Sequence, residues 1–116
     1  MNPNVLFVIA SDPRVSHRPA EAIRIAAGVG AWKRADITLY LRAAAVLALN
    51  ESTEGLIDDE NYRRYLPMLR DSGRPIYVQR GAPLLAELGE IAFKIEEVDD
   101  AQLAALAGRS NYVIRF

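Results

Sequence analysis

The sequence predicts an α/β fold, in which helices cover both faces of a mainly parallel β-sheet. Apolar runs and segments of helical periodicity alternate five times along 116 residues. Residues 5–10 (VLFVIA) form a continuous apolar run, which is typical of a strand buried on both faces. The length leaves no room for a second domain. We therefore expect a single domain, residues 1–116, with three α/β/α layers and a five-stranded sheet.

Five segments have the composition of strands. They are rich in β-branched and aromatic residues and are bounded by polar or glycine-containing loops. The fourth segment alternates apolar and polar residues, as an edge strand does. The expected strands cover residues 5–10, 35–41, 76–79, 93–98 and 111–116.

The first helix is expected over residues 19–33, with Pro19 in the first turn, where proline is tolerated. Gly28 and Gly30 each cost up to about 1 kcal/mol relative to alanine inside a helix. They therefore predict a close approach of this helix to the sheet or to a neighbouring subunit. The apolar residues at helical spacing are Ala22, Ile25, Ala26, Val29 and Trp32.

Four further helical segments follow. Residues 42–49 favour a helical turn or a short helix, because alanine and leucine are strong helix formers. Residues 58–72 form an amphipathic helix in which Pro67 predicts a kink or a break. A helix over residues 82–88 would directly follow the third strand, and the last helix runs through residues 100–107.

Composition excludes several classes of function. Fourteen basic and fifteen acidic residues give a formal charge of −1, so neither nucleic acid nor a membrane surface is an expected partner. The absence of cysteine excludes thiolate nucleophiles and thiolate metal sites, and a single histidine makes a metal site improbable. We expect no cofactor. No signal or membrane-spanning segment is recognisable, so we expect a cytoplasmic location.

A ligand site is expected where the strands end, because open parallel sheets bind ligands beyond the carboxyl ends of their strands. The loops at that edge are residues 11–18, 42–45 and 79–82. The expected ligand-binding residues are Ser11, Asp12, Arg14, His17, Gln79 and Arg80.

The loop SDPRVSHR, residues 11–18, allows two interpretations. Its hydroxyl, guanidinium and backbone N–H groups at a helix start could hold an anion, and His17 could act as a general base. The simpler interpretation is a solvated polar loop in which Ser16 caps the helix. Phosphate-binding glycine motifs and a serine nucleophile motif are missing.

Tyr62 and Tyr65 lie next to Arg63 and Arg64, which could indicate an RNA-stacking patch. Helical spacing brings the tyrosines together and points the arginines mostly elsewhere. The balanced charge of the chain gives no support to RNA binding. A position in the core or in a subunit interface is the better interpretation of the two tyrosines.

The chain resembles the DsrE/DsrF-like family of small sulfur-relay proteins over about residues 4–116. The resemblance rests on NVLFVIASDP, on AEAIRIAAGVGAWKRADITLYLRAAAVLAL and on LRDSGRPIYVQRGAPLLAELG. It implies one α/β/α domain with a five-stranded, mainly parallel sheet. It also implies assembly into trimers, hexamers or hetero-oligomers, and sulfur transfer through a cysteine persulfide just after the third strand.

This sequence departs from the family pattern at the position of the persulfide. Gln79 stands where active members have cysteine, and a glutamine amide cannot bond to sulfur and release it. Sulfurtransferase activity is therefore not expected. Ala43 and Ala44 also replace a glycine and an acidic residue that members often carry after the second strand.

These observations predict an oligomeric binding domain, a homotrimer or homohexamer, without persulfide chemistry. Its partner would be another protein or a small anionic ligand. The alternative is a cysteine-independent enzyme or an anion- or nucleotide-binding module that uses the loop after the first strand, with His17 as acid–base and Arg14 or Arg80 as a clamp. A phosphate-receiver domain is disfavoured, because Gln79 stands where such domains have aspartate.

Overall fold

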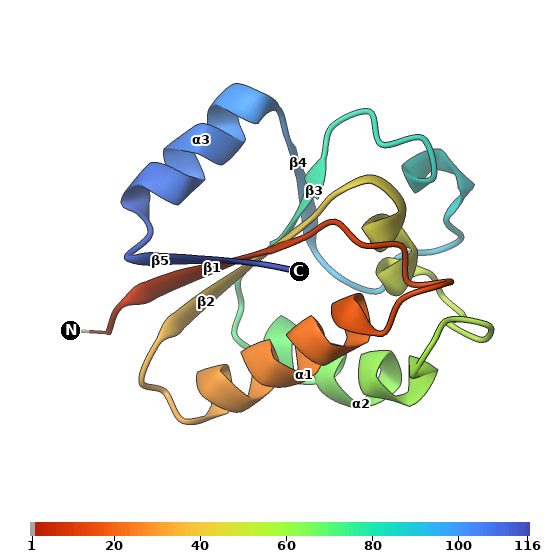
Figure 1. The fold of residues 1–116 in the computed structure, drawn as a ribbon, viewed down its shortest axis with the longest axis horizontal. Helices are drawn as coiled ribbons and strands as arrows, with labels where there is room; N and C mark the ends of the chain where they lie inside the picture. The colour runs from red at the N-terminus through yellow and green to blue at the C-terminus, as the bar shows by residue number, and fades with distance from the viewer. Residues whose placement is uncertain (1) are drawn as a thin grey trace.

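The computed structural model describes residues 2–116 and contains one five-stranded sheet (Figure 1). All neighbouring strands pair in parallel, in the order β4-β3-β2-β1-β5. The predicted α/β class and the five parallel strands are confirmed. The strands are β1 (Asn4–Ile9), β2 (Asp36–Leu41), β3 (Ile76–Gln79), β4 (Ile95–Val98) and β5 (Tyr112–Arg115).

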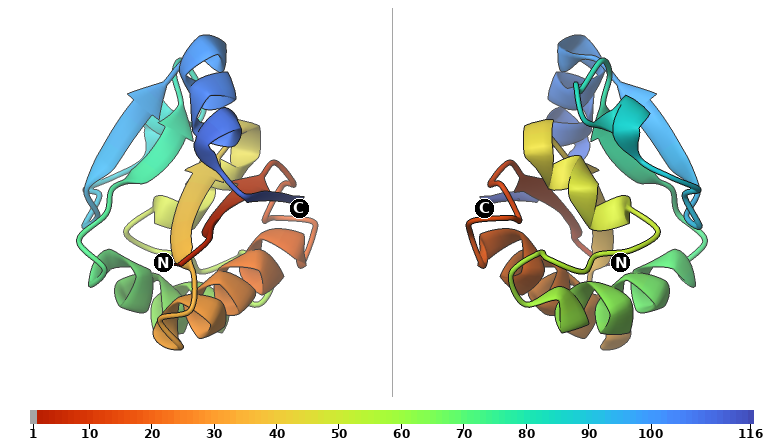
Figure 2. Two further views of the ribbon diagram at one scale, coloured as in Figure 1. Left: turned by 90° about the vertical axis from the view of Figure 1, so that its left-hand side faces the viewer. Right: turned by 90° about the vertical axis from the view of Figure 1, so that its right-hand side faces the viewer.

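Helices cover the sheet unequally on its two faces. Helices α1 (Arg18–Ala31) and α2 (Asp59–Arg70) lie side by side below the sheet, and α3 (Asp100–Arg109) lies alone above it (Figures 1 and 2). No helix within residues 2–116 is long and apolar enough to cross a bilayer.

The position of β1 inside the sheet, between β2 and β5, explains why its sequence is continuously apolar. Val5, Phe7 and Ile9 belong to the larger core, which packs below the sheet against α1 and α2. Leu6 and Val8 belong to a smaller cluster on the side of α3. Because successive side chains of a strand point to opposite faces, a strand that has helices on both faces needs apolar residues at every position.

The buried face of α1 differs in part from the predicted stripe. Ala22 and Ala26 are buried as expected, but Val29 and Trp32 are 39% and 74% exposed. The helix also buries Ile23 and Ala27, which the predicted stripe omitted.

The predicted close approach holds for one of the two glycines of α1. A Cβ atom on Gly30 would lie 3.4 Å from Cγ1 of Ile37 in β2, whereas Gly28 has open space beside it in this chain. Gly30 therefore marks the point where the end of α1 comes nearest to the sheet.

Two helix predictions need correction. The break at Pro67 does not occur, since α2 continues through it to Arg70. The helix expected over residues 82–88 is wrong, because the structure has only the single 3₁₀ turn η2 (Leu85–Glu87). Gly81 has φ +76°, and so short a segment gains too few hydrogen bonds to repay helix nucleation.

The expected short helix after β2 is confirmed as the 3₁₀ helix η1 (Ala43–Leu49). Helix α3 begins with a capping box, in which Asp99 accepts the N–H of Gln102 and Gln102 accepts the N–H of Asp99, both at 2.8 Å. The short strands β4 and β5 form the two edges of the sheet.

Candidate functional site

Gln79 is the last residue of β3 and lies at the carboxyl edge of the sheet. It pairs with Val98 of β4, which packs in the cluster beneath α3, so Gln79 shares that face. Its side chain is half-buried, and its Oε1 accepts the backbone N–H of Ala43 at 2.9 Å. The amide thus joins the tip of β3 to the turn that follows β2.

The turn after β2 contains an unusual backbone conformation. The N–H of Arg42 donates to Ile9 at 2.9 Å, and the chain then turns into η1 with Ala43 at φ +52°. Residues with a Cβ rarely adopt this left-handed conformation, which favours glycine. The strain therefore lies at the residue whose N–H contacts Gln79.

Four charged side chains belong to the segments that adjoin Gln79 at this edge. Arg80 Nη1 lies 3.7 Å from Asp99 Oδ2, and Arg42 Nη2 lies 3.8 Å from Asp100 Oδ1. The side chains of Arg80 and Asp100 are 57% and 84% exposed. Long, exposed ion pairs of this kind contribute about 0–1 kcal/mol. Both arginines can therefore change partners at little cost.

In the loop after β1, Arg14 is bound to Asp12. Its backbone N–H and its Nε donate to Asp12 Oδ1, and its Nη2 donates to Oδ2 at 2.9 Å. The side-chain hydrogen bond from Arg14 lowers the pKa of the Asp12 carboxyl, and the backbone hydrogen bond adds to this effect. These hydrogen bonds stabilise the loop itself and occupy both oxygens of Asp12.

The start of α1 is also occupied by local contacts. The hydroxyl of Ser16 accepts the N–H of Arg18 at 3.1 Å, while the exposed His17 holds the N-cap position without a side-chain cap bond. Ser16 thus supports the helix start as the simpler interpretation of this loop predicted, although it is not the N-cap residue. The guanidinium of Arg18 lies 5.8 Å above the ring of Phe116.

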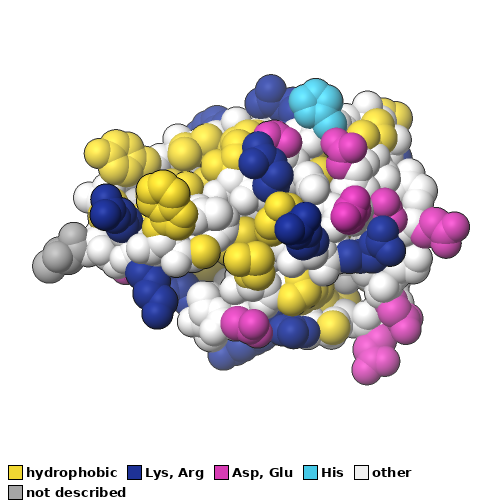
Figure 3. Space-filling view, turned by 90° about the horizontal axis from the view of Figure 1, so that it is seen from below, with side chains coloured by type: hydrophobic (Ala, Val, Ile, Leu, Met, Phe, Trp, Pro, Cys, Tyr) yellow, Lys and Arg dark blue, Asp and Glu magenta, His cyan; other side chains and the backbone are white. Residues whose placement is uncertain are grey.

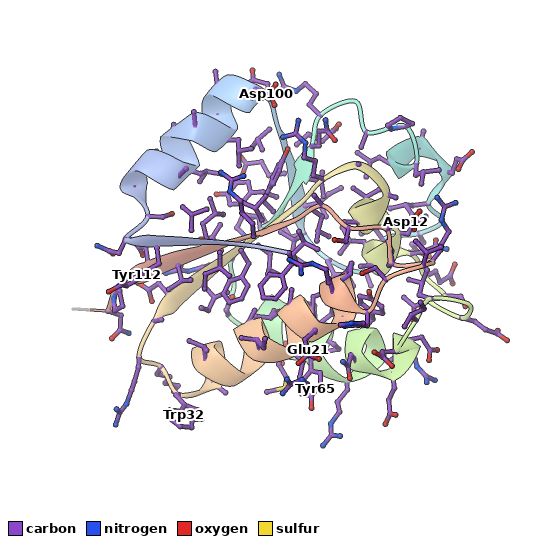
Figure 4. All side chains as sticks on the ribbon, viewed as in Figure 1. Asp12, Glu21, Trp32, Tyr65, Asp100 and Tyr112 are labelled. Carbon is purple, nitrogen blue, oxygen red and sulfur yellow. The ribbon has the colours of Figure 1, made fainter. Side chains whose placement is uncertain are left out.

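The six predicted ligand residues do not form one cluster. Ser11 follows the end of β1, and its loop then leans toward α2, where the N–H of Ile57 donates to Pro13 at 2.9 Å. Gln79 lies on the opposite face. Figure 4 shows Asp12 and Asp100 well apart, the former at the loop end and the latter at the start of α3.

Asp99 and Asp100 lie close to Gln79 and Arg80, although neither aspartate was among the predicted ligand-binding residues. One signal was available: β4 ends at Val98, so the residues after it reach the same edge as the tip of β3. Arg42 belonged to a predicted edge loop but was not singled out.

Neither of two sizeable cavities is lined by the six predicted residues. A cavity of about 510 Å³ opens at the amino edge of the sheet, between the C-terminal ends of α1 and α2. A second cavity, of about 330 Å³, lies between η1, α2 and the segment before β4. Within residues 2–116, no three histidine, aspartate or glutamate side chains lie close enough together to hold a metal ion.

The comparisons with known proteins concern the fold. No protein-family model and no curated protein matches the sequence. The crystal structure of the ychN protein from E. coli is similar to this chain, with a TM-score of 0.79 and 19% sequence identity over 100% of both chains. The likeness shows the fold, and it supports the DsrE/DsrF-like fold that the sequence resemblance implied.

Proposed function

We propose that this chain is an oligomeric, DsrE/DsrF-like binding domain that performs no persulfide chemistry and binds an anion at the Gln79 edge. The observation that carries the proposal is the position of Gln79. The side chain stands at the tip of β3, hydrogen-bonded to the turn after β2, and it offers an amide where the resemblance implies a sulfur carrier.

The donors at this edge suit an anion. Gln79 accepts the Ala43 N–H through Oε1, which leaves its NH2 group as the donating end of the side chain. Arg80 and Arg42 lie beside it and hold their aspartates only through long contacts. An arriving anion gains charge-assisted hydrogen bonds, which are stronger than the pairs that it displaces.

The open geometry of the edge accommodates two sources of the anion. A free small molecule and an acidic side chain of a partner protein present the same oxygen acceptors to Arg80 and Gln79. The side chain of Arg80 is more than half exposed, so a partner surface can reach it.

The oligomeric part of the proposal rests on exposed apolar side chains. Figure 3 shows large hydrophobic side chains at the left-hand end of the face seen from below, and others across the middle of that face between charged side chains. Trp32 is 74% and Tyr112 62% exposed, and Figure 4 places both at that end of the molecule. Large apolar side chains exposed at one end of a molecule are typical of an interaction surface. The cytoplasmic location stays a prediction from the sequence.

The anion site is tested by titrating isotope-labelled protein with sodium phosphate and following backbone amide shifts by NMR. We expect saturable shifts at Ala43, Gln79 and Arg80. Replacing Arg80→Gln should weaken binding about fivefold, by roughly 1 kcal/mol, through the loss of one exposed charged donor.

The matched control is Arg34→Gln, which removes the same charge from an exposed position in the loop between α1 and β2. It should leave the affinity unchanged. If both variants weaken phosphate binding equally, the affinity depends on net charge alone and not on Arg80. The absence of saturable shifts at Ala43, Gln79 and Arg80 would contradict the anion site.

A further inference from the structure

The two edge strands of the sheet differ in how they would meet a further strand. β4 exposes Glu96 and Glu97, and charges of this kind protect an edge from pairing. β5 exposes all of its residues and lies at the opposite margin of the sheet (Figure 2). It contains no proline, and its register with β1 is continuous, so no bulge interrupts the edge. The exposed apolar side chains of β5 are Tyr112, Val113 and Ile114.

The backbone groups of β5 point alternately toward β1 and toward the open side of the sheet. Phe116, directly after β5, directs both its N–H and its C=O to the end of β1, over 2.9 Å each. Because this pattern repeats at every second residue of a parallel pair, Val113 and Arg115 turn their backbone groups away from β1. The oxygen of Arg115 accordingly accepts a long hydrogen bond, of 3.4 Å, from the guanidinium of Arg18 in α1. Val113 and Arg115 thus offer N–H and C=O groups to a further strand.

An antiparallel copy of β5 fits these groups when the two-fold axis passes beside Ile114. Val113 of each copy then pairs with Arg115 of the other, and the outward N–H and C=O groups of both residues are bonded. An axis closer to the start of β5 would need the N–H of Asn111, which already donates to the oxygen of Asn4 at 2.8 Å. An axis at Arg115 would set two like charges opposite each other. The β5 edge is therefore complementary to itself in one register.

Helix α1 extends this surface below the sheet. Figure 2 shows α1 under the β5 side of the sheet and α2 under the β4 side. The guanidinium of Arg18 lies 5.8 Å above the ring of Phe116, so the side of α1 that carries Arg18 is turned toward the β5 edge. Ile25, Val29 and Trp32 follow Arg18 at helical spacing and share that side. Val29 and Trp32 are 39% and 74% exposed, and therefore remain uncovered in the single chain.

We propose that two copies of this chain pair through their β5 strands, antiparallel about Ile114, and form one continuous sheet. The second copy suits this edge because each Arg115 meets Val113 and no like charge, while the exposed sides of the two α1 helices approach each other below the sheet. A two-fold pair is also the commonest closed assembly of identical chains. The inference rests on the oligomer in the proposed function, names one of its interfaces and requires an even number of chains.

Disulfide formation by a single introduced cysteine tests this register, since the chain contains no cysteine of its own. In the proposed pair the two Ile114 residues face each other without hydrogen bonds, with their Cα atoms about 4.5 Å apart. That distance lies within the span of a disulfide. Ile114→Cys, oxidised with diamide, should therefore run as a covalent dimer in non-reducing gel electrophoresis.

Val113→Cys is the matched control, because Val113 and Ile114 are 37% and 39% exposed. In the proposed register the two Val113 residues are offset along the strands, and their Cα atoms lie about 8 Å apart. A disulfide does not span that distance without backbone movement, so this variant should form little covalent dimer. Equal yields from the two variants, or a higher yield from Val113→Cys, would overturn the register.

A pair of charge substitutions tests the same contact without oxidation. Val113→Glu and Val113→Lys each place a charge opposite Arg115 of the second copy. Val113→Glu should strengthen self-association about threefold and Val113→Lys should weaken it about threefold, as measured by sedimentation velocity. If the two variants have equal effects, Val113 does not face Arg115 of a second copy.

Light scattering of the unmodified chain separates this inference from the proposed oligomer. A strict monomer would contradict both. A chain that is oligomeric, but whose Ile114→Cys variant forms no covalent dimer, would contradict the β5 pairing and leave the proposed oligomer standing.

Discussion

The contact between Gln79 and Ala43 couples an unreactive side chain to a strained backbone. Ala43 adopts φ +52° and donates its N–H to the amide oxygen of Gln79 at 2.9 Å. A left-handed alanine costs about 1–2 kcal/mol and persists only where surrounding contacts enforce it. Here the hydrogen bond from Arg42 to Ile9 and the start of η1 fix the chain on either side.

The strain at Ala43 gives a prediction for a glycine substitution. Ala43→Gly should leave the free energy of unfolding unchanged or raise it by about 0.5 kcal/mol, because glycine adopts positive φ without a steric cost. Ala44→Gly, inside η1, is the control and should lower it by about 0.5–1 kcal/mol. Urea unfolding measures both changes. If Ala43→Gly lowers the free energy of unfolding as much as Ala44→Gly does, the backbone at Ala43 is not strained.

The pair between Asp12 and Arg14 predicts a pH dependence. Because hydrogen bonds from Arg14 lower the pKa of Asp12 below the usual value of 3.8 for an aspartate, the pair stabilises the fold above that pH. This contribution is lost as the pH falls through the lowered pKa. Asp12→Asn should therefore flatten the fall in stability on acidification below about pH 4.

The measurement for Asp12 is the urea midpoint between neutral and strongly acidic pH. Asp71→Asn, at an exposed aspartate whose contact with Arg70 is long, at 3.6 Å, is the control and should leave the loss of stability at acidic pH unchanged. If the stability of the Asp12→Asn variant falls on acidification as steeply as that of the unmodified chain, the pair of Asp12 and Arg14 contributes no pH-dependent stability.

The sequence predicted the place of an individual site residue only where that residue stands at the end of a predicted strand. The apolar pattern of residues 76–79 ends at Gln79, so its place at the strand tip followed from the sequence. The buried hydroxyls of Thr53 and Tyr62 have no hydrogen-bond partner among residues 2–116, which depends on tertiary packing that no local sequence pattern shows.

At the level of secondary structure, periodicity located the long elements and failed in the short ones. Most residues of the helix predicted over residues 82–88 are good helix formers, but the segment contains Pro83 and follows Gly81 at φ +76°, and it forms only the single turn η2. In α1 the predicted stripe followed the apolar residues, but the sheet buries Ile23 and Ala27, while Val29 and Trp32 reach solvent. Periodicity alone does not show which apolar side meets the sheet.

The capping box of α3 gives a prediction at this scale. Asp99 accepts the N–H of Gln102 at 2.8 Å. Asp99→Ala should therefore lower the free energy of unfolding by about 1 kcal/mol. Asp100→Asn, which removes only a charge from the first turn, should lower it by about 0.3 kcal/mol. Thermal unfolding by circular dichroism compares the two, and equal losses would mean that the cap bond contributes nothing specific.

For the whole molecule, the alternation of elements predicted the class but not the order of the strands. The order β4-β3-β2-β1-β5 places the last strand of the chain beside the first. Every residue of β5 is exposed, including the apolar Val113 and Ile114. An edge strand of this kind is open to further pairing or packing. The sequence contained the apolar residues, but only the topology shows that they face solvent.

The apolar end formed by Trp32 and Tyr112 leads to a prediction about assembly. The unmodified chain should have a mass in light scattering that is a multiple of 12.8 kDa, and Trp32→Ser with Tyr112→Ser should shift it toward the monomer. Val15→Ser removes an apolar side chain that is 76% exposed in the loop after β1, and it should leave the mass unchanged. An unmodified chain that is strictly monomeric would contradict the proposed oligomer.

The most direct test of the central claim is the pH dependence of alkylation of a Gln79→Cys variant. A thiolate at the tip of β3 would receive the Ala43 N–H and lie beside Arg80, so we predict that it is alkylated with an apparent pKa clearly below the usual value of about 8.5. Ser72→Cys, at an exposed position near the amino edge of the sheet, provides the reference thiol. If the apparent pKa of the Gln79→Cys thiol equals or exceeds that of the reference thiol, the edge does not stabilise a thiolate. That result would contradict the interpretation that Gln79 occupies the place of a sulfur carrier.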